Sequence, residues 1–205
     1  MTRDAFVRQM QLYMPEAACL IAYDWVETNP VLIRITKPRR SKLGDYRPKG
    51  KDGKAVLSVN GNLNQYSFLI TFTHEIAHHI DFIERNSLRN PHGDSWKKIY
   101  SKLLTQLLEN KCFPTVLELE VKNHIHNPKA ASCSDPKLLS KLNEFNSVQV
   151  LQLIDIAEGE MFQIASNKRI FTKGELKRIR FRCQEKLTGR FYMVHGQCEV
   201  ELINS

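Results

Sequence analysis

Long hydrophobic runs are absent from this chain of 205 residues. The longest uninterrupted apolar stretch, residues 17–23, is far shorter than the roughly 20 residues that a bilayer-spanning helix needs. The first ten residues carry charged and polar side chains where a secretory signal would have an apolar core. We therefore expect no membrane segment and a cytoplasmic location.

Cysteine is scarce, and the cysteines do not occur in closely spaced pairs. The chain has five cysteines, widely spaced and never arranged as Cys-x-x-Cys. A disulfide framework uses an even set in an oxidising compartment, and a zinc ribbon uses closely spaced pairs. We therefore expect reduced, partly buried thiols and neither of those two frameworks.

Acidic residues are fewer than basic residues, so the chain has a net charge of +8. The basic residues are concentrated in two segments. Segment 37–54 has eight basic and two acidic residues, a net +6, and segment 168–190 has nine basic and two acidic residues, a net +7. By difference, the rest of the chain carries −5. Local density of this kind favours a polyanionic partner such as nucleic acid, and the alternative is a solvated surface.

The remaining composition, 42% hydrophobic and 25% charged, is that of a packed globular protein with one or two small domains. Residues 4–21 continue into an apolar run to Trp25 and predict helices with a boundary at Pro15. Residues 31–35 and 55–59 are β-branched and predict two strands on either side of the basic loop 37–53.

The central part of the chain predicts two strong helices. Leu69, Phe72, Ile76, Ile80 and Ile83 recur at spacings of 3 or 4, as on the buried stripe of a helix. A second apolar stripe runs through residues 96–108, and Asp94 or Ser95 can cap that helix.

The pattern weakens after this second helix. Residues 111–147 predict a connector with one short helix at 137–145. Residues 148–205 predict a basic antiparallel β module with strands near 160–164, 169–171, 176–183, 190–194 and 198–203. The expected fold class is thus α+β.

The long helix contains the sequence His74-Glu75-Ile-Ala-His78. Residues four apart lie on one helix face, so two imidazoles can share one Zn²⁺ with Glu75 beside them as a base. A shuffled chain of this composition would contain the motif only about 0.016 times. The alternative is a polar, hydrogen-bonded helix surface, since His79, Asp81 and Glu84 also lie on this helix.

A catalytic zinc needs a third protein ligand. The metzincin pattern would place Gly at 81 and His at 84, and this chain has Asp81 and Glu84 there. His92, which precedes Gly93 and the second helix, is the candidate, with Glu84 or Glu109 as alternatives. His124 and His126 have no nearby metal-ligand partners, and we expect them to be surface histidines.

The two motifs together, His74-Glu-x-x-His78 and His92-Gly93-x-x-Trp96, resemble the SprT-like (Spartan-related) family of zinc metallopeptidases. Residues 39–44 and 57–60 also resemble the family's basic turn and strand, so the resemblance covers residues 5–110. It implies a zincin-like metallopeptidase domain at 1–110, one catalytic Zn²⁺ on His74, His78 and His92, and Glu75 as acid/base. The chain departs from bacterial members that end in a Cys-x-x-Cys ribbon.

The family includes proteases of DNA–protein crosslinks, so the resemblance implies DNA and DNA-bound protein substrates as partners, in the nucleoid or, in a eukaryote, the nucleus. The strand pattern of 176–183 places alternate arginines on one face near Phe191 or Tyr192, where they can bind phosphates and stack bases. An arginine-rich solvent face is the alternative. The candidate nucleic-acid contacts in the two segments are Arg39, Arg40, Lys42, Arg47, Arg178, Arg180 and Arg182.

Three functions remain open at this point. The first is a DNA-associated zinc endopeptidase that hydrolyses peptide bonds of DNA-bound or crosslinked proteins. The second is a non-enzymatic nucleic-acid-binding protein with a structural zinc, which would have no need of Glu75. The third is a cytosolic zinc peptidase that acts independently of DNA.

Overall fold

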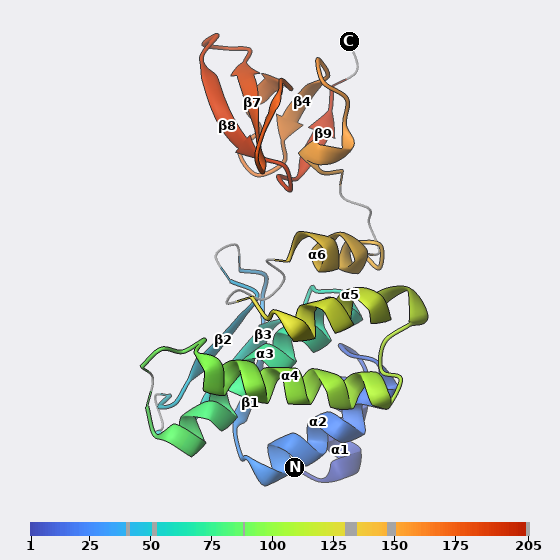
Figure 1. The fold of residues 1–205 in the computed structure, drawn as a ribbon, viewed down its shortest axis with the longest axis vertical. Helices are drawn as coiled ribbons and strands as arrows, with labels where there is room; N and C mark the ends of the chain where they lie inside the picture. The colour runs from blue at the N-terminus through green and yellow to red at the C-terminus, as the bar shows by residue number, and fades with distance from the viewer. Residues whose placement is uncertain (40–41, 51–52, 88, 130–134, 147–150, 204–205) are drawn as a thin grey trace. The chain divides into compact units, whose positions relative to one another are not determined.

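The computed structural model describes residues 1–39, 42–50, 53–87, 89–129, 135–146 and 151–203. They form six α-helices and two β-sheets, the mixed α+β content that the sequence predicts. The chain divides into two compact units, residues 1–147 and 148–205, and each has its own hydrophobic core (Figure 1). No helix among the described residues combines the length and apolarity needed to cross a membrane.

The first unit opens with helices α1 (Arg3–Met10) and α2 (Glu16–Thr28), which meet at Pro15 as expected. The hydroxyl of Thr2 accepts a hydrogen bond from the backbone N–H of Ala5 and begins α1. Both helices bury one face in the core, with Phe6 and Trp25 among the covered side chains.

A three-stranded sheet follows, formed by β1 (Leu32–Thr36), β2 (Gly44–Arg47) and β3 (Val56–Asn60). The central strand β3 is buried along its whole length and pairs parallel to β1 and antiparallel to β2. Strands β1 and β3 confirm the prediction. Strand β2 lies inside the segment that we expected to be a loop, because its sequence Gly-Asp-Tyr-Arg has no β-branched residue.

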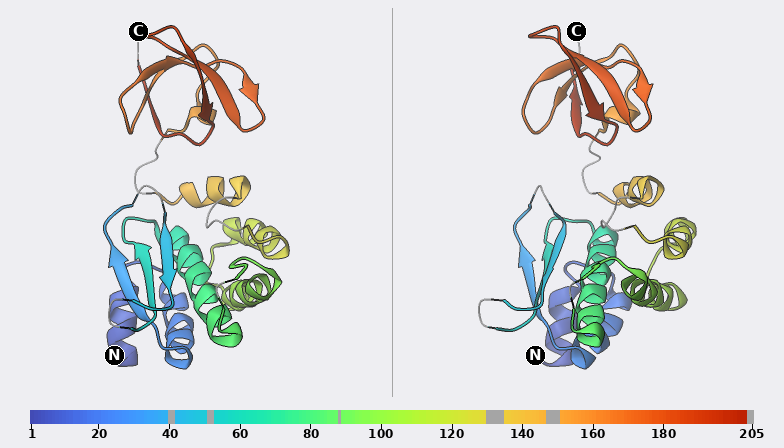
Figure 2. Two further views of the ribbon diagram at one scale, coloured as in Figure 1. Left: turned by 90° about the vertical axis from the view of Figure 1, so that its left-hand side faces the viewer. Right: turned by 60° about the vertical axis from the view of Figure 1, so that its left-hand side comes forward.

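Helix α3 (Gln65–Arg85) occupies the centre of the first unit, with the sheet on one side and α4 (Asp94–Glu109) on the other (Figure 2). The side-chain oxygen of Asn64 caps α3 by accepting from the backbone N–H groups of Tyr66 and Ser67. Helix α4 begins after Gly93 without a side-chain cap, so the expected capping by Asp94 or Ser95 is wrong.

Residues 111–147 belong to the first unit and do not form a separate connector. They carry α5 (Thr115–His126) as well as α6 (Pro136–Asn143), and both helices bury leucine side chains in the first core. Helix α5 was not predicted, because exposed Val116 and Leu119 obscure the stripe formed by buried Leu117 and Val121. The helix predicted at 137–145 corresponds to α6.

The second unit is a six-stranded antiparallel sheet preceded by a single 3₁₀ turn, η1 (Leu153–Asp155). Strand β7 pairs with β5, β6 and β8, while β4 pairs with β5 and β9. Its strands are β4 (Met161–Ile164), β5 (Ile170–Thr172), β6 (Leu176–Lys177), β7 (Arg180–Glu185), β8 (Phe191–His195) and β9 (Val200–Leu202).

The cysteines that the structure describes are free thiols. Cys19, Cys112 and Cys183 are buried, and Cys198 is half-buried. Cys133 lies outside the described residues. The described part of the chain therefore fits the expectation of reduced thiols.

Candidate metal centre

Helix α3 supplies two imidazoles to a single point. His74 and His78 are four positions apart on the helix, and their Nε2 atoms lie 3.1 Å apart. His74 and Glu75 are both buried, as are His79 and Asp81 on the following turn. Most of the polar groups of this helix are therefore buried, which is not what the alternative of a polar, hydrogen-bonded helix surface predicts.

The third imidazole comes from the segment between α3 and α4. The Nε2 atom of His92 lies 3.0 Å from that of His78 and 3.3 Å from that of His74. The backbone of Gly93 turns back to the carbonyl of Asn90 at 3.0 Å, which directs His92 toward α3. The structure thus brings together the three histidines that the sequence predicts as ligands.

The three nitrogens fit the requirements of one metal ion. Tetrahedral Zn²⁺ with Zn–N bonds of about 2.0–2.1 Å places its nitrogen ligands about 3.3 Å apart, close to the observed triangle. Within the described residues, these three histidines form the only group of His, Cys, Asp or Glu side chains that can hold a metal ion. The identity of the metal is not set by this arrangement alone, because imidazole also suits copper, iron and nickel.

Burial keeps the imidazoles neutral, as metal ligands must be. Burial, together with the neighbouring histidines, lowers the pKa of His74 to about 2 and that of His78 to about 4. The pKa of His92 is also lowered by burial. The Nε2 atoms of the three neutral rings face one another, and hydrogen bonds among them cannot satisfy all three. A cation can bind the lone pairs of all three nitrogens.

Trp96 covers the apolar side of the centre. Its indole ring is fully buried and lies 4.7 Å from His74, 5.2 Å from His78 and 4.8 Å from His92, measured between ring centroids. Tyr100 stacks on the indole from the next turn of α4, at 4.8 Å. Trp96 therefore packs against the rings of all three candidate ligands.

Glu75 lies next to the histidines on the side of α3 that faces β2. The residue is only 5% exposed, and burial is the main cause that raises the pKa of its carboxyl to about 8. The charge of Asp45 contributes in the same direction, while Arg39 and Lys42 oppose it. A carboxyl group with such a pKa can both accept and release a proton near neutral pH.

The backbone of β2 passes close to this carboxyl group at Gly44. A Cβ atom at residue 44 would lie 2.4 Å from Oε1 of Glu75, so only glycine fits without moving the acid. The hydroxyl of Tyr46, two residues along β2, lies 3.0 Å from Nδ1 of His79 on α3. Strand β2 therefore contacts α3 at Glu75 and again one turn later at His79.

The side chain of Arg39 forms hydrogen bonds with residues near β2 and in β3. Its guanidinium donates to Oδ1 of Asn60 at 2.8 Å and to Oγ of Ser58 at 3.1 Å, and also to backbone carbonyls. One of those carbonyls belongs to Leu43, immediately before Gly44. These contacts hold Arg39 against β3 and against the residue that precedes β2, and its predicted contact with nucleic acid stays a prediction.

The other basic residues of the first segment are also placed by the structure. Lys42 and Arg47 both pair with Asp45, at 2.8 and 2.9 Å. Arg40 lies outside the described residues. Because Asp45 neutralises part of the local charge, the segment presents less free positive charge than its sequence suggests.

The alternative ligands lie away from the centre. Glu84 is exposed and Glu109 is at the far end of α4, about 20 Å along the axis from Trp96 at 1.5 Å per residue. His126 is exposed, as expected. His124 is 1% exposed and lies 3.4 Å from the hydroxyl of Tyr100, so our prediction that it is a surface histidine is wrong.

The arginines of the second unit occupy two kinds of position. Arg180 and Arg182 are exposed on β7 and alternate with buried Phe181 and Cys183, as predicted. Arg178 has a positive φ of 59° in the turn between β6 and β7, so the expected continuous strand 176–183 and its three-arginine face are wrong. Ile179 is 60% exposed in the same turn.

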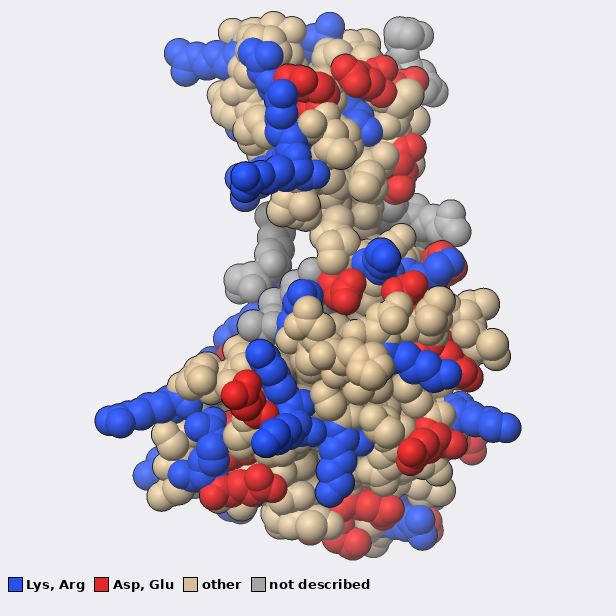
Figure 3. Space-filling view, in the orientation of Figure 1, with Lys and Arg blue, Asp and Glu red and all other residues tan. Residues whose placement is uncertain are grey.

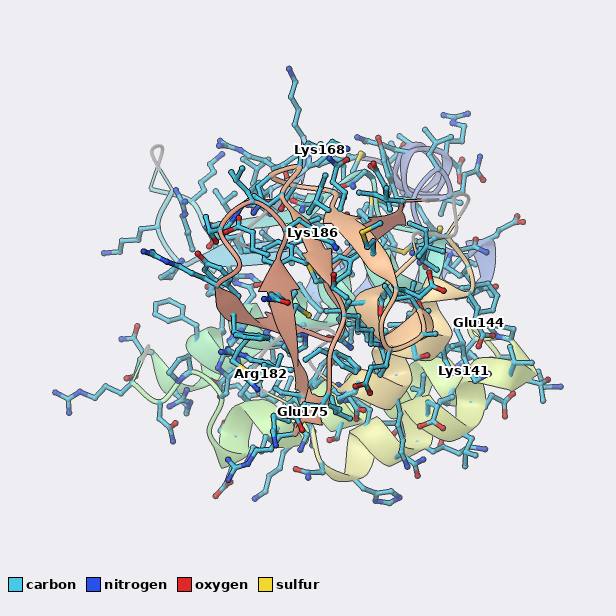
Figure 4. The ribbon with its side chains drawn as sticks, turned by 90° about the horizontal axis from the view of Figure 1, so that it is seen from above. Lys141, Glu144, Lys168, Glu175, Arg182 and Lys186 are labelled. Carbon is cyan, nitrogen blue, oxygen red and sulfur yellow. The ribbon has the colours of Figure 1, made fainter. Side chains whose placement is uncertain are left out.

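Of the two aromatic residues predicted beside these arginines, Phe191 or Tyr192, the one that contacts Arg182 is Phe191. It lies on β8, is 53% exposed, and has the guanidinium carbon of Arg182 4.0 Å from its ring centre. Lysine and arginine side chains gather on the side of this unit where Figure 1 shows β8 and β7 (Figure 3). Lys168 lies well apart from Arg182 (Figure 4) and pairs with Glu201 at 2.7 Å, so the +7 of this segment is not one patch.

No protein-family model, curated protein or solved structure matches the chain. The sequence motif was sufficient to find the three histidines and Glu75. It did not identify Gly44, Tyr46 or the inward role of Arg39, which depend on the unpredicted strand β2. The only sequence signal for β2 is the turn chemistry of Pro48 and Gly50 after it.

Proposed function

We propose that the first unit is a zincin-like metallopeptidase domain of the SprT-like type and that the protein is a zinc-dependent endopeptidase. The observation that carries this proposal is the convergence of three imidazole nitrogens within 3.0–3.3 Å beside a buried carboxyl group. The described residues offer no fourth ligand for a closed structural site. An open coordination position is typical of catalytic zinc.

In this mechanism His74, His78 and His92 hold the ion and Glu75 moves the proton. When bound, Zn²⁺ supplies Lewis acidity, which lowers the pKa of water and polarises a scissile carbonyl. As a carboxylate, Glu75 accepts the proton of the attacking water, and as a neutral acid it donates that proton to the leaving amine nitrogen. Trp96 keeps bulk water away from the buried side of the three rings.

The decisive variant is Glu75→Gln, which keeps the size of the side chain and removes the proton acceptor. We expect it to abolish peptide-bond hydrolysis while zinc content stays at one ion per chain. Glu84→Gln, on the exposed side of the same helix, is the matched control and should retain wild-type turnover. Turnover by Glu75→Gln would contradict the role of this residue, and a wild-type protein with zinc but no turnover of any substrate would favour a non-enzymatic, structural zinc.

We further propose that nucleic acid recruits the enzyme through the β7–β8 face of the second unit. This face carries exposed Arg180, Arg182 and Phe191, and no carboxylate among the described residues pairs with either arginine. Phosphates can bind the guanidinium groups and an unpaired base can stack beside the exposed ring. DNA-bound or crosslinked proteins are then the substrates, in the nucleoid or the nucleus.

The Arg180→Gln/Arg182→Gln double variant tests the recruitment. We expect weaker binding of single-stranded oligonucleotides, a salt dependence whose slope falls by about 1–2, and unchanged zinc content. Lys168→Gln, which removes one positive charge elsewhere on the unit, is the control. Hydrolysis by wild type that is equally fast with and without single- or double-stranded DNA would instead indicate a DNA-independent peptidase.

A further inference from the structure

Asp81 is a buried acidic residue that the proposed reaction does not use. Its side chain is 3% exposed, although it lies near the end of α3. Burying a carboxylate is costly unless it is paired and hydrogen-bonded. Asp81 meets this condition through Arg85, whose Nε donates to Oδ1 at 2.8 Å and whose Nη2 contacts Oδ2. The side chain of Ser95 also favours the charged form of Asp81 and lowers its pKa.

The partners of Asp81 connect the two ends of the segment that carries His92. Arg85 uses its remaining nitrogen, Nη1, to donate to the backbone carbonyl of Arg89 at 3.0 Å. Ser95 belongs to the first turn of α4, immediately after that segment. One carboxylate on α3 thus supports the start of the segment through Arg85 and interacts with the first turn of α4 that follows its end.

The backbone of this segment turns through the left-handed conformation at two positions. Asn86 and Asn90 both adopt the left-handed conformation, with φ of 48° and 52°. Such conformations are sparsely populated by residues other than glycine and persist when surrounding contacts fix them. The hydrogen bond from Arg85 to the backbone carbonyl of Arg89 lies between these two asparagines. It fixes the backbone of the segment three residues before His92.

Asp81 also lies on the correct face of the helix. Residues 74, 78, 81 and 85 follow one another at spacings of 4, 3 and 4, which is a single stripe along α3. The stripe therefore presents two metal ligands followed, one turn further on, by the pair that holds the third ligand's segment. His92 reaches its position 3.0 Å from His78 only if that segment is folded against this stripe.

We propose that Asp81 and Arg85 act as a positioning pair that places His92 in the metal centre. The inference rests on the proposed metal site and adds a determinant of its affinity. Neither residue contacts the reacting atoms, and both act through the backbone of the described residues 86–87 and 89–93. Outer contacts of this kind change metal affinity about 10–100-fold when they are removed.

The test measures the zinc affinity of the full-length protein by competition with a chromophoric chelator. Asp81→Asn removes the charge that pairs with Arg85, and Arg85→Lys keeps a positive charge opposite Asp81 but loses the planar fork that also reaches Arg89. We expect each variant to bind zinc about 10–100-fold more weakly than wild type. Glu84→Gln, on the same turn but exposed, should leave the affinity unchanged.

A second comparison separates positioning from a general effect on folding. Each variant is also made in a His92→Ala background, where only the two imidazoles of α3 remain. If Asp81 and Arg85 act through His92, their replacement has no further effect on zinc affinity in that background. An equal loss in both backgrounds, or no loss in either, overturns the inference and leaves the proposed metal site intact.

Far-UV circular dichroism of each variant confirms that the helices are retained, and Arg85→Lys is the milder change should Asp81→Asn unfold the protein. The absorption of bound Co²⁺ gives an independent readout, since loss of one imidazole changes the coordination geometry. A wild-type chain that binds neither Zn²⁺ nor Co²⁺ would overturn the proposed function together with this inference.

Discussion

Gly44 sits where the backbone of β2 passes the carboxyl group of Glu75. Its missing side chain makes that approach possible, because an added Cβ would lie 2.4 Å from Oε1. We expect Gly44→Ala to displace the acid and lower kcat at least tenfold while the protein keeps its zinc. Overpacking of this kind costs about 1–3 kcal/mol of stability. Peptidase assays, zinc analysis and urea unfolding measure the three quantities, and an unchanged kcat would contradict the steric argument.

The buried imidazoles give the metal-free protein a defined response to acid. Burial lowers the pKa values of His74 and His78 to about 2 and about 4, so the unfolded chain binds more protons below its ordinary histidine pKa near 6.5. The free energy of unfolding therefore falls as pH falls below about 6.5, by on the order of 2 kcal/mol for each histidine at pH 5.

Urea unfolding at pH 7 and pH 5, with a chelator present, tests this response. His78→Gln should show a smaller pH dependence than wild type, because one of the two strongly shifted groups has been removed. A metal-free protein that is equally stable at both pH values would show that the imidazoles are not held in their neutral form.

At the scale of elements, α3 depends on a cap that also joins it to another helix. The side-chain oxygen of Asn64 accepts from two backbone N–H groups at the start of α3. Its side-chain nitrogen donates to the carbonyl of Leu142 in α6, at 2.9 Å, and contacts Asn146. One side chain thus fixes the beginning of the ligand-bearing helix and its contact with α6.

Replacement of Asn64 by Ala should therefore cost more than an ordinary cap. We expect a loss of about 2 kcal/mol, since a cap alone is worth about 1 kcal/mol and the hydrogen bonds from the Asn64 amide to Leu142 and Asn146 are lost as well. Thr2→Ala removes the more exposed cap of α1 and should cost less. Chemical unfolding of both variants decides, and equal losses would contradict the double role of Asn64.

Elements with a strong hydrophobic period were predictable from sequence, whereas those defined by contacts between elements were not. Helix α3 has an apolar stripe with spacings of 3 and 4, and it carries His74, Glu75 and His78. The same stretch of sequence therefore predicts both the helix and the main site residues. Strand β2 has no such signal and exists because it pairs with the buried strand β3. The positions of Gly44 and Arg39 follow from that pairing and were therefore missed.

At the scale of the whole molecule, the two units have separate hydrophobic cores. We expect residues 1–147 to bind zinc without the second unit and residues 148–205 to bind oligonucleotide without the first. Calorimetry of the full chain should show that zinc shifts the melting of the first unit only, because a ligand stabilises the unit that binds it. A single transition that shifts as a whole would show that the units unfold together.

The origin of the three ligands also sets how quickly an ion can leave. Two of them belong to one helix, which keeps its shape when the metal departs, and the third belongs to a segment held by Asp81 and Arg85. Local opening of that segment requires less free energy than unfolding of α3. Exchange of isotopically labelled zinc should therefore be much faster than global unfolding, and Arg85→Lys should shorten the residence time of the ion.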